Sequence, residues 1–256
     1  MQNKYAIALL AVLTEAYLIR REGLRGGATD EEVFASMPGD DIIPRPMVET
    51  THAITIRAPA SEIWHWLVQM GYYRAGWYAD PRLPGWWDEM ADRVLRAFLT
   101  GEERGRAPRR KTPSADHILP QFQNLHLGDV IEDGPPGTAY FTVKGLEANH
   151  FLALHSTTHI RYLLPASLRN NSRLGIFGDF TWVFALKRSD EQTTRLILRT
   201  RANYGPKWFR LLSMPLLLTM EAVMPHRTLL NIKERVECTG KAGLEELKTG
   251  EPLAST

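Results

Sequence analysis

The pair Asp116-His117 has the residue types best suited to proton transfer in this chain. An imidazole titrates near neutral pH, so His117 is a candidate general acid or base. The neighbouring Ile118-Leu119 would desolvate the ring, and desolvation keeps an imidazole neutral and therefore basic at neutral pH. Adjacent residues on a strand or turn point apart, so a direct carboxylate–imidazole dyad is not implied. A hydrogen-bonding role that fixes the loop is the alternative.

Three further polar residues are candidates to share a pocket rim with His117: Gln69, Tyr78 and Asp80. If the protein is an enzyme, we predict His117, Asp116 and Tyr78 as its catalytic residues. Trp77 lies between them in sequence and is predicted either to contact a ligand or to anchor its loop on the preceding helix.

A second group of residues suits an apolar ligand. Side chains alternate between the two faces of a strand, so the apolar positions at 180, 182, 184 and 186 share one face. This strip either packs as plain core or lines a cavity in which Trp182 and Phe184 touch a ligand. Met220, in the apolar C-terminal stretch, is predicted to line the same cavity.

The next strand has three arginines on one face: Arg195, Arg199 and Arg201. A solvent-exposed face with cross-strand ion pairs is one interpretation. If the face is concave instead, Arg199 becomes a desolvated fork for a carboxylate or phosphate headgroup. A buried guanidinium is costly when unpaired, so this alternative requires an Asp or Glu nearby.

The sequence gives no sign of a metal or cofactor site. His155 and His159, taken as one strand, would be separated by about 13 Å, which is too far for one metal ion. The chain has no nucleophile elbow, phosphate-binding glycine loop or dinucleotide fingerprint. Five basic residues lie between 102 and 111, and we interpret them as a solvated loop rather than an anion site.

These residues must be positioned by a mixture of strands and helices. Residues 48–56 alternate like a strand, and Pro59 then starts a helix with apolar residues at helical spacing. Thr29 and Glu32 form a capping box for a short helix. Four more strands are predicted at residues 140–143, 151–159, 180–187 and 194–202. Residues 207–237 are predicted to be helical and to be broken or kinked at Pro215 and Pro225.

The N-terminus has an apolar run from Ala6 to Leu13 that is followed by Glu15. Because a spanning helix needs about 20 mainly apolar residues, we expect an amphipathic helix packed on the domain. A membrane-surface anchor through residues 5–19 and a cleaved signal peptide are the alternatives.

Composition favours an ordinary globular protein. The chain has 256 residues, 44% hydrophobic content and a formal net charge of +2, which does not support nucleic-acid binding. The single cysteine excludes an intrachain disulfide and fits a reducing compartment, so we expect a cytoplasmic protein, with membrane association left open.

Several segments together resemble the helix-grip, START-like (SRPBCC) superfamily, which includes pollen-allergen proteins, polyketide cyclases and lipid-transfer domains. The closer likeness is to a bacterial branch, through GATDEEVFASMPGDD, ITIRAPASEIWHWLVQMGYYRAGWY, SADHILPQFQNLHLGD, TWVFALK, TRLILRTR and LLNIKERVE. The resemblance spans residues 27–238. It implies an α+β fold in which a curved antiparallel sheet wraps a long C-terminal helix and leaves a cavity between them.

The sequence departs from these relatives after residues 71–78 (GYYRAGWY), which we call the aromatic loop. Relatives continue it with a compact Tyr-Ser-Tyr-Asp stretch, whereas Tyr78 here precedes Ala79-Asp80-Pro81 and a longer excursion, which implies a remodelled pocket wall. We predict an N-terminal extension over residues 1–47, a helix-grip domain over 48–240 with an insertion at 80–113, and a disordered tail over 241–256.

The function predicted from these features is non-catalytic binding of a hydrophobic small molecule or lipid in the cavity. The alternatives are a cofactor-free enzyme of the polyketide cyclase or dehydratase type, and a membrane-surface or partner-binding module that uses the N-terminal helix.

Overall fold

The structure is a computed structural model of the whole chain. It describes residues 23, 25–78, 114–135, 137–162, 164, 166–169 and 171–249; for residues 166, 167, 212, 214–220, 222, 223 and 239–249 the description covers the backbone only.

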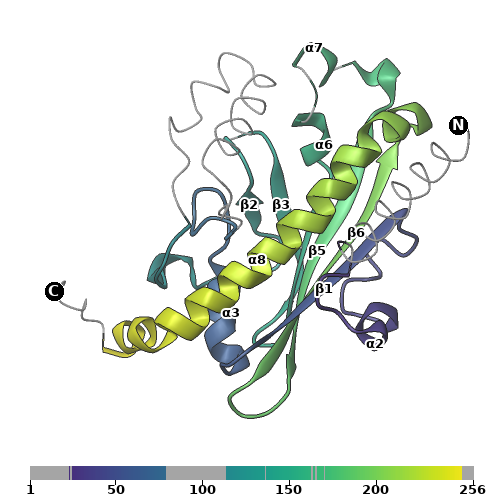
Figure 1. Cartoon of the computed structure of the whole chain (residues 1–256). Helices are drawn as coiled ribbons and strands as arrows, with labels where there is room; N and C mark the ends of the chain where they lie inside the picture. Colours follow the sequence, from purple (N-terminus) through teal and green to yellow (C-terminus); the bar gives the residue numbers. More distant parts are fainter. Residues whose placement is uncertain are drawn as a thin grey trace, which may run out of the picture.

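Six antiparallel strands form one sheet in the order β1-β6-β5-β4-β3-β2 (Figure 1). Their bounds are β1 Val48–Ile56, β2 Val130–Glu132, β3 Tyr140–Glu147, β4 Phe151–Ser156, β5 Phe177–Arg188 and β6 Thr194–Gly205. Half of the residues in β5 are β-branched or aromatic, and β5 and β6 are buried on both faces rather than on alternate residues. The two strands lie where they were predicted, and the apolar positions at 180, 182, 184 and 186 share one face as expected.

Two helices cover the inner face of the sheet. α3 (Ala60–Val68) follows β1 directly, and α8 (Lys207–Thr249) lies diagonally across the sheet and packs on β1, β6 and α3 (Figure 1). Ile63, Trp66 and Leu67 of α3 and Leu229 and Ile232 of α8 belong to the main hydrophobic cluster with the inner sides of the strands. A curved antiparallel sheet around a long C-terminal helix is the helix-grip architecture, so the predicted α+β fold is confirmed.

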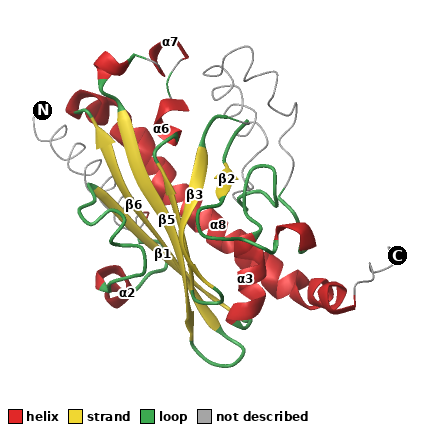
Figure 2. Ribbon diagram, turned by 180° about the vertical axis from the view of Figure 1, so that it is seen from behind, coloured by secondary structure: helices red, strands yellow, loops and turns green. Residues whose placement is uncertain are grey.

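The outer face is covered by residues 25–47, which include α2 (Asp30–Phe34) (Figure 2). Both hydrogen bonds of the Thr29–Glu32 capping box are present, as predicted. A second hydrophobic cluster joins Met37 of this segment to Ala53, Val183 and Ile197 on the outer side of the sheet. The sheet therefore has two buried faces.

Short elements connect the strands at one end of the molecule: α6 (His159–Tyr162), α7 (Ala166–Arg169) and the 3₁₀ helix η2 (Ser172–Leu174). A further 3₁₀ helix, η1 (Pro120–Phe122), follows the segment that contains His117. No helix in the described part of the chain is both long and apolar enough to cross a membrane.

Two elements differ from the sequence-based prediction. α8 continues through Pro215 and Pro225 and runs to Thr249, beyond the boundary predicted at residue 240. β4 ends at Ser156, so His155 and His159 do not share a strand, and His159 instead begins α6. The polar Ser156-Thr157-Thr158 sequence explains this end, because the Ser156 hydroxyl accepts the Thr158 N–H in a local turn.

Candidate functional site

The structure corrects the environment predicted for His117. Its imidazole is 57% exposed, so Ile118 and Leu119 do not desolvate it. The ring does pair with its neighbour, because Nδ1 lies 2.9 Å from Asp116 Oδ1. This hydrogen bond lowers the pKa of the Asp116 carboxyl. The pair is therefore a solvent-exposed local contact, and its carboxylate stays ionised.

Gln69 and Tyr78 come together as predicted, but inside the protein. The Gln69 side chain donates to the Tyr78 hydroxyl at 2.8 Å and to the His117 carbonyl at 3.2 Å, and it accepts from Leu119 N at 2.8 Å. Gln69 and Tyr78 are both fully buried. These contacts attach the aromatic loop to the segment of residues 114–119. Gln69 and Tyr78 therefore position these segments and do not form the rim of a pocket.

The same loop is also fixed to α8. Thr228 donates to the Trp77 carbonyl at 3.1 Å, and Asn231 donates to the Tyr78 carbonyl at 2.7 Å. Gly76 has a φ of 78°, and a Cβ there would lie 2.5 Å from the Ser114 hydroxyl, so this position requires glycine. The backbone thereby directs the Trp77 ring towards the inner face of the sheet. Asp80 lies outside the described residues.

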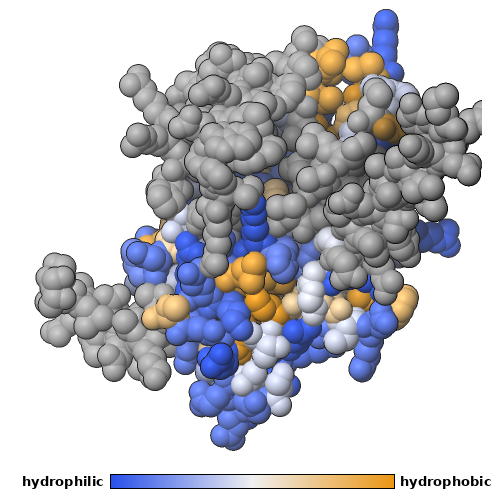
Figure 3. All heavy atoms as spheres, viewed as in Figure 1, coloured by the Kyte–Doolittle hydropathy of each residue, from blue (hydrophilic) through white to orange (hydrophobic). Residues whose placement is uncertain are grey.

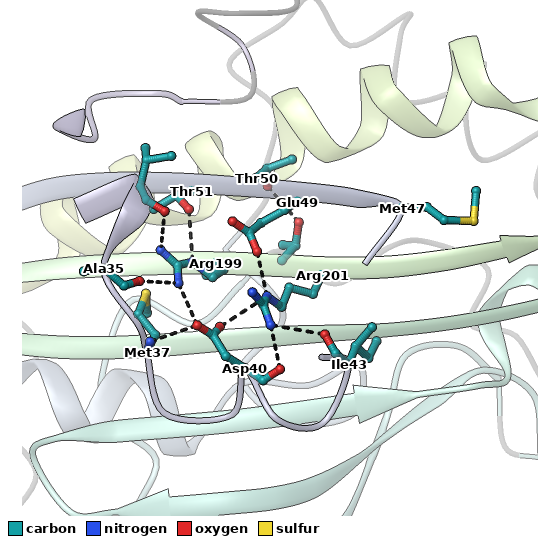
Figure 4. Close-up of polar contacts among 12 residues, drawn as sticks. Ala35, Met37, Asp40, Ile43, Met47, Glu49, Thr50, Thr51, Arg199 and Arg201 are labelled. Atoms are coloured by element: carbon teal, nitrogen blue, oxygen red, sulfur yellow. Dashed lines mark hydrogen bonds and ion pairs between the residues drawn. The ribbon is translucent and has the colours of Figure 1, made fainter. Parts of the chain in front are cut away.

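Arg199 is buried, but on the outer face and away from α8. Its guanidinium donates to Thr51 Oγ1, to Asp40 Oδ2 at 2.9 Å and to the Ala35 carbonyl (Figure 4). It also donates to the backbone carbonyls of residues 32 and 33. Arg201 pairs across the strands with Glu49 at 2.6 Å and with Asp40 at 3.3 Å. The predicted requirement for a carboxylate partner is confirmed. The prediction of a solvent-exposed face and the alternative prediction of a ligand site at Arg199 are both wrong, because residues 25–47 cover these side chains.

On the inner face, five aromatic side chains form a continuous surface that we call the aromatic floor: Trp77, Phe141, Phe180, Trp182 and Phe184. The Trp77 ring centroid lies 5.2 Å from Phe141 and 5.9 Å from Trp182. Phe180 contacts Phe141 at 5.3 Å, and Phe184 contacts Trp182 at 6.2 Å. The indole Nε1 of Trp77 is buried and has no hydrogen-bond partner among the described residues. A buried N–H without a partner is costly, so this donor is available to a ligand. The Met220 side chain lies outside the description.

One side of the aromatic floor carries a buried carboxyl group. Glu221 of α8 accepts hydrogen bonds from Thr200 at 2.7 Å and from the Tyr204 hydroxyl at 3.1 Å. Burial raises the pKa of Glu221 even though both hydrogen bonds favour its ionised form. Burial and the nearby Glu221 also raise the pKa of Tyr204. Thr200 pairs with Trp182 in the sheet register, so this acidic side adjoins the floor directly.

The opposite side carries a hydrogen-bonded chain of three residues. His159 Nδ1 lies 2.6 Å from Ser156 Oγ, and His159 Nε2 lies 2.7 Å from Asp133 Oδ2. When Nε2 donates to the Asp133 carboxyl group, Nδ1 is free to accept from the Ser156 hydroxyl, which is the arrangement of a Ser–His–Asp triad. The imidazole also packs against Phe141 at 4.6 Å and Phe180 at 4.8 Å. This Ser156–His159–Asp133 chain, which we call the His159 relay, lies at the edge of the floor.

The sheet register fixes the spacing of the two sides. Ser156 on β4 pairs with Phe180 on β5, and Trp182 on β5 pairs with Thr200 on β6. Two strand spacings, about 10 Å, separate β4 from β6. The aromatic rings therefore lie between a carboxyl group of raised pKa on one side and the His159 chain on the other. Groups whose environments differ in this way suit acid and base roles.

Sequence reasoning missed both sides of the site. Glu221 had a usable signal, since it is the only acidic residue between 192 and 233 in an otherwise apolar or basic stretch. Asp133, Ser156 and His159 had none, because they come from three elements and Asp133 is 26 residues from His159. In contrast, the predicted contact residues Trp77, Trp182 and Phe184 do lie together on the floor.

Fold and site together define an α+β helix-grip protein with an aromatic inner surface between two polar groups. No protein-family model matches the sequence, and no curated protein sequence matches it. MLL2253 from Mesorhizobium loti has a similar structure, with 12% identity, TM-score 0.37, and coverage of 75% of this chain and 98% of that one.

Two further solved structures show similarity at the same level. Norcoclaurine synthase from Thalictrum flavum is 13% identical, with TM-score 0.34 and coverage of 72% of this chain and 85% of that one. DynU16, a protein of the dynemicin biosynthetic locus, is 13% identical, with TM-score 0.33 and coverage of 81% and 49%. Similarity this low concerns the general fold only, and the helix-grip assignment is drawn from the topology described above.

Proposed function

We propose that the protein binds a hydrophobic small molecule or lipid against the aromatic floor, between the sheet and α8. The observation that carries this proposal is the continuous aromatic surface with a buried indole N–H, at Trp77, that has no partner in the described part of the chain. Binding sites for small molecules combine apolar walls with a few placed polar groups, and the Trp77 donor, Glu221 and the His159 relay supply those groups here.

The direct test is native mass spectrometry of protein purified without denaturation, which should show a retained apolar molecule. Binding of an environment-sensitive apolar dye should also quench tryptophan fluorescence. Trp182→Leu should weaken dye binding by about tenfold, since an aromatic contact contributes roughly 0.5–1.5 kcal/mol beyond its area. Phe34→Leu is the control, because Phe34 is exposed on α2, on the opposite side of the sheet from the floor. No retained molecule and equal dye binding by both variants would refute the proposal.

A second candidate function is a cofactor-free enzyme of the cyclase or dehydratase type. The observation that favours it is the Ser156–His159–Asp133 relay opposite a carboxyl group of raised pKa. In this mechanism the base is the Ser156 oxygen, which passes its own proton to His159 Nδ1, and the acid is Glu221; they stand in place of His117 and Asp116. The base removes a proton from carbon next to a carbonyl group, and the acid donates to the carbonyl oxygen as the enol forms.

An enolisable aromatic ketone such as 2-tetralone tests this chemistry in D₂O. Enol formation at the site should exchange the α-hydrogens for deuterium, which proton NMR measures. His159→Gln should slow the exchange by about 100-fold or more, the usual contribution of a general base. His117→Gln is the control and should leave the rate unchanged, because that ring lies in solvent. Exchange no faster than in buffer would exclude the enzyme and leave the binding proposal intact.

A further inference from the structure

One end of the molecule combines exposed apolar side chains with positive charge. α6, α7, η2, the start of β5 and the start of α8 all lie there (Figures 1 and 2). Contacts hold these elements together: Gly178 of β5 packs directly on Ile160 of α6, and Gly205 at the end of β6 packs directly on the Phe177 ring.

Three large apolar side chains are exposed at this end, and we call them the end patch: Phe177, Trp208 and Leu211. Their exposed fractions are 52%, 47% and 80%. Trp208 and Leu211 are three residues apart on α8 and therefore neighbours on its surface. Phe177 pairs with Gly205, just before α8 begins. Figure 3 shows hydrophobic surface at this end of the molecule. Exposed aromatic and aliphatic groups that cluster in this way mark an interaction surface.

The two chain segments that carry the end patch have charge of one sign, although the Asp133 carboxylate contacts His159 of α6 from a neighbouring turn. Residues 157–178 contain Arg161, Arg169 and Arg173 and no acidic residue, while residues 204–220 contain Lys207 and Arg210 and no acidic residue. The whole chain, in contrast, is nearly balanced, with 31 basic and 29 acidic residues. The next carboxylate along β5, Asp179, is ion-paired with His155 at 2.6 Å.

A pocket of ≈ 90 Å³ adds a polar feature to the same end. Arg161, Arg169 and Ser172 contribute to its wall beside Leu168. Guanidinium and hydroxyl groups are the side chains that bind phosphate oxygens best. Arg169 is held in place by the Leu164 carbonyl and the Tyr162 ring, and Arg161 lies in the same wall, so both guanidinium groups stand beside the end patch.

We propose that this end of the protein docks on the surface of an anionic membrane. Tryptophan and phenylalanine favour the membrane–water interface, and basic residues around them attract anionic headgroups. A second copy of the chain is a poorer occupant, because two such ends would bring like charges together. Docking here is independent of the ligand proposed above. It would, however, place lipid near the aromatic floor, because Phe180 follows Phe177 on β5 by about 10 Å.

The test uses the full-length protein and vesicles of phosphatidylcholine with or without phosphatidylglycerol. Cosedimentation should require phosphatidylglycerol and decrease as salt is raised. Adding inorganic phosphate should have no effect beyond that of chloride at equal ionic strength, which separates a lipid surface from a free anion. Trp208→Ser/Leu211→Ser and Lys207→Glu/Arg210→Glu should each reduce the bound fraction by about tenfold.

Matched control variants test position rather than composition. Phe34→Ser/Leu127→Ser removes two equally exposed apolar groups elsewhere, and Lys187→Glu/Arg188→Glu reverses two exposed charges at the other end of β5. Both controls should bind vesicles like the wild-type protein. Patch variants that bind as well as the controls would overturn the proposal. It would also be overturned if the patch variants abolished only a lipid-free dimer, measured by analytical ultracentrifugation.

Discussion

Burial and hydrogen bonding have opposite effects on the protonation of Glu221, on the inner face of the sheet. Hydroxyl groups of Thr200 and Tyr204 donate to its two oxygens, and Thr50 extends the chain through a 2.7 Å contact with Thr200. These donors favour a carboxylate, whereas burial favours the protonated acid, and burial has the larger effect on the pKa of Glu221. A carboxyl group that holds its proton can donate to a ligand oxygen, which an ionised one cannot.

Replacing Glu221 with glutamine is therefore expected to stabilise the fold at neutral and alkaline pH. The pKa of Glu221 is higher in the folded state than its unfolded value of about 4.3, so the folded protein binds the proton more tightly. The stability that this proton provides is fully present below about pH 4.3 and is lost as pH rises through the folded pKa. Urea unfolding at a series of pH values should show a gap between variant and wild type that widens with pH.

Titrations of other groups affect the wild type and Glu221→Gln equally, so they cancel in the difference between the two stabilities. His52 is buried beside His226, and burial together with repulsion from His226 lowers its pKa to about 4. Stability from this group rises with pH between about 4 and 6.5, the opposite sign, but it is common to both proteins. Glu234→Gln, an exposed change on α8, should show no gap. Parallel curves for the wild type and Glu221→Gln would contradict the prediction.

At the scale of elements, Asp40 connects the segment of residues 25–47 to β6. Its Oδ2 accepts from Arg199 at 2.9 Å and from the Met37 N–H at 2.9 Å, and its Oδ1 lies 3.3 Å from Arg201 (Figure 4). Without this carboxylate, Arg199 would be a buried cation whose other partners are a hydroxyl and carbonyl groups.

Asp40→Ala is expected to lower the free energy of unfolding by about 3–5 kcal/mol, the usual cost of breaking a buried ion pair by removing one partner. Asp40→Ala/Arg199→Met should recover part of this loss, because both charges leave together. Recovery should be incomplete, since the carbonyls of residues 32, 33 and 35 lose their donor. Urea unfolding of the three proteins gives the coupling energy.

A matched change at an exposed ion pair is the control. Arg188→Met removes a partner of Glu191 at 3.7 Å, where both side chains are largely in solvent. This change should alter the free energy of unfolding by no more than about 0.5 kcal/mol. If Asp40→Ala has an equally small effect, the network on the outer face does not hold the segment.

The elements that could be predicted from the sequence are those that depend only on residues close together in the chain. The positions of β5 and β6 and the capping box at Thr29 depend on neighbouring residues only, and both are confirmed. The continuity of α8 through two prolines could not be predicted, because it depends on packing against β1, β6 and α3. Tertiary packing of this kind overrides the local preference of a residue.

The candidate site was only partly predictable for the same reason. The shared face of Trp182 and Phe184 could be predicted from side-chain alternation along one strand. The proximity of Gln69 and Tyr78 could be predicted because they lie at the two ends of one short loop. The face that Arg199 occupies depends on where residues 25–47 fold back, which no spacing in the sequence reveals. The His159 relay needs the order of β4, β3 and β2 in the sheet, since Asp133 follows β2.

At the scale of the whole molecule, each face of the sheet has its own covering layer. α3 and α8 cover the inner face, and residues 25–47 cover the outer face with an apolar cluster and the Asp40 network. β5 contributes to both layers and also links the end patch to the aromatic floor. The outer layer therefore stabilises the strands that carry the site, although it touches neither side of it.

A chain that begins at residue 48 is accordingly expected not to fold stably, even though it contains the complete helix-grip domain. Its outer face would expose Ala53, Val183 and Ile197, and exposed apolar surface costs about 25 cal/mol per Å². Arg199 would also lose its carboxylate partner and its carbonyl acceptors in one step. Size-exclusion chromatography should show aggregation or an expanded species, and urea unfolding should lack a cooperative transition.

A chain that begins at residue 25 is the control, because it keeps the outer layer intact. We expect it to stay soluble and to unfold cooperatively at a lower temperature than the full chain, as the amphipathic N-terminal helix predicted from sequence would no longer pack on the domain. The contrast between the two truncations assigns the effect to residues 25–47. A monomeric 48–256 fragment that melts at the same temperature as the 25–256 chain would show instead that the sheet needs only its inner layer.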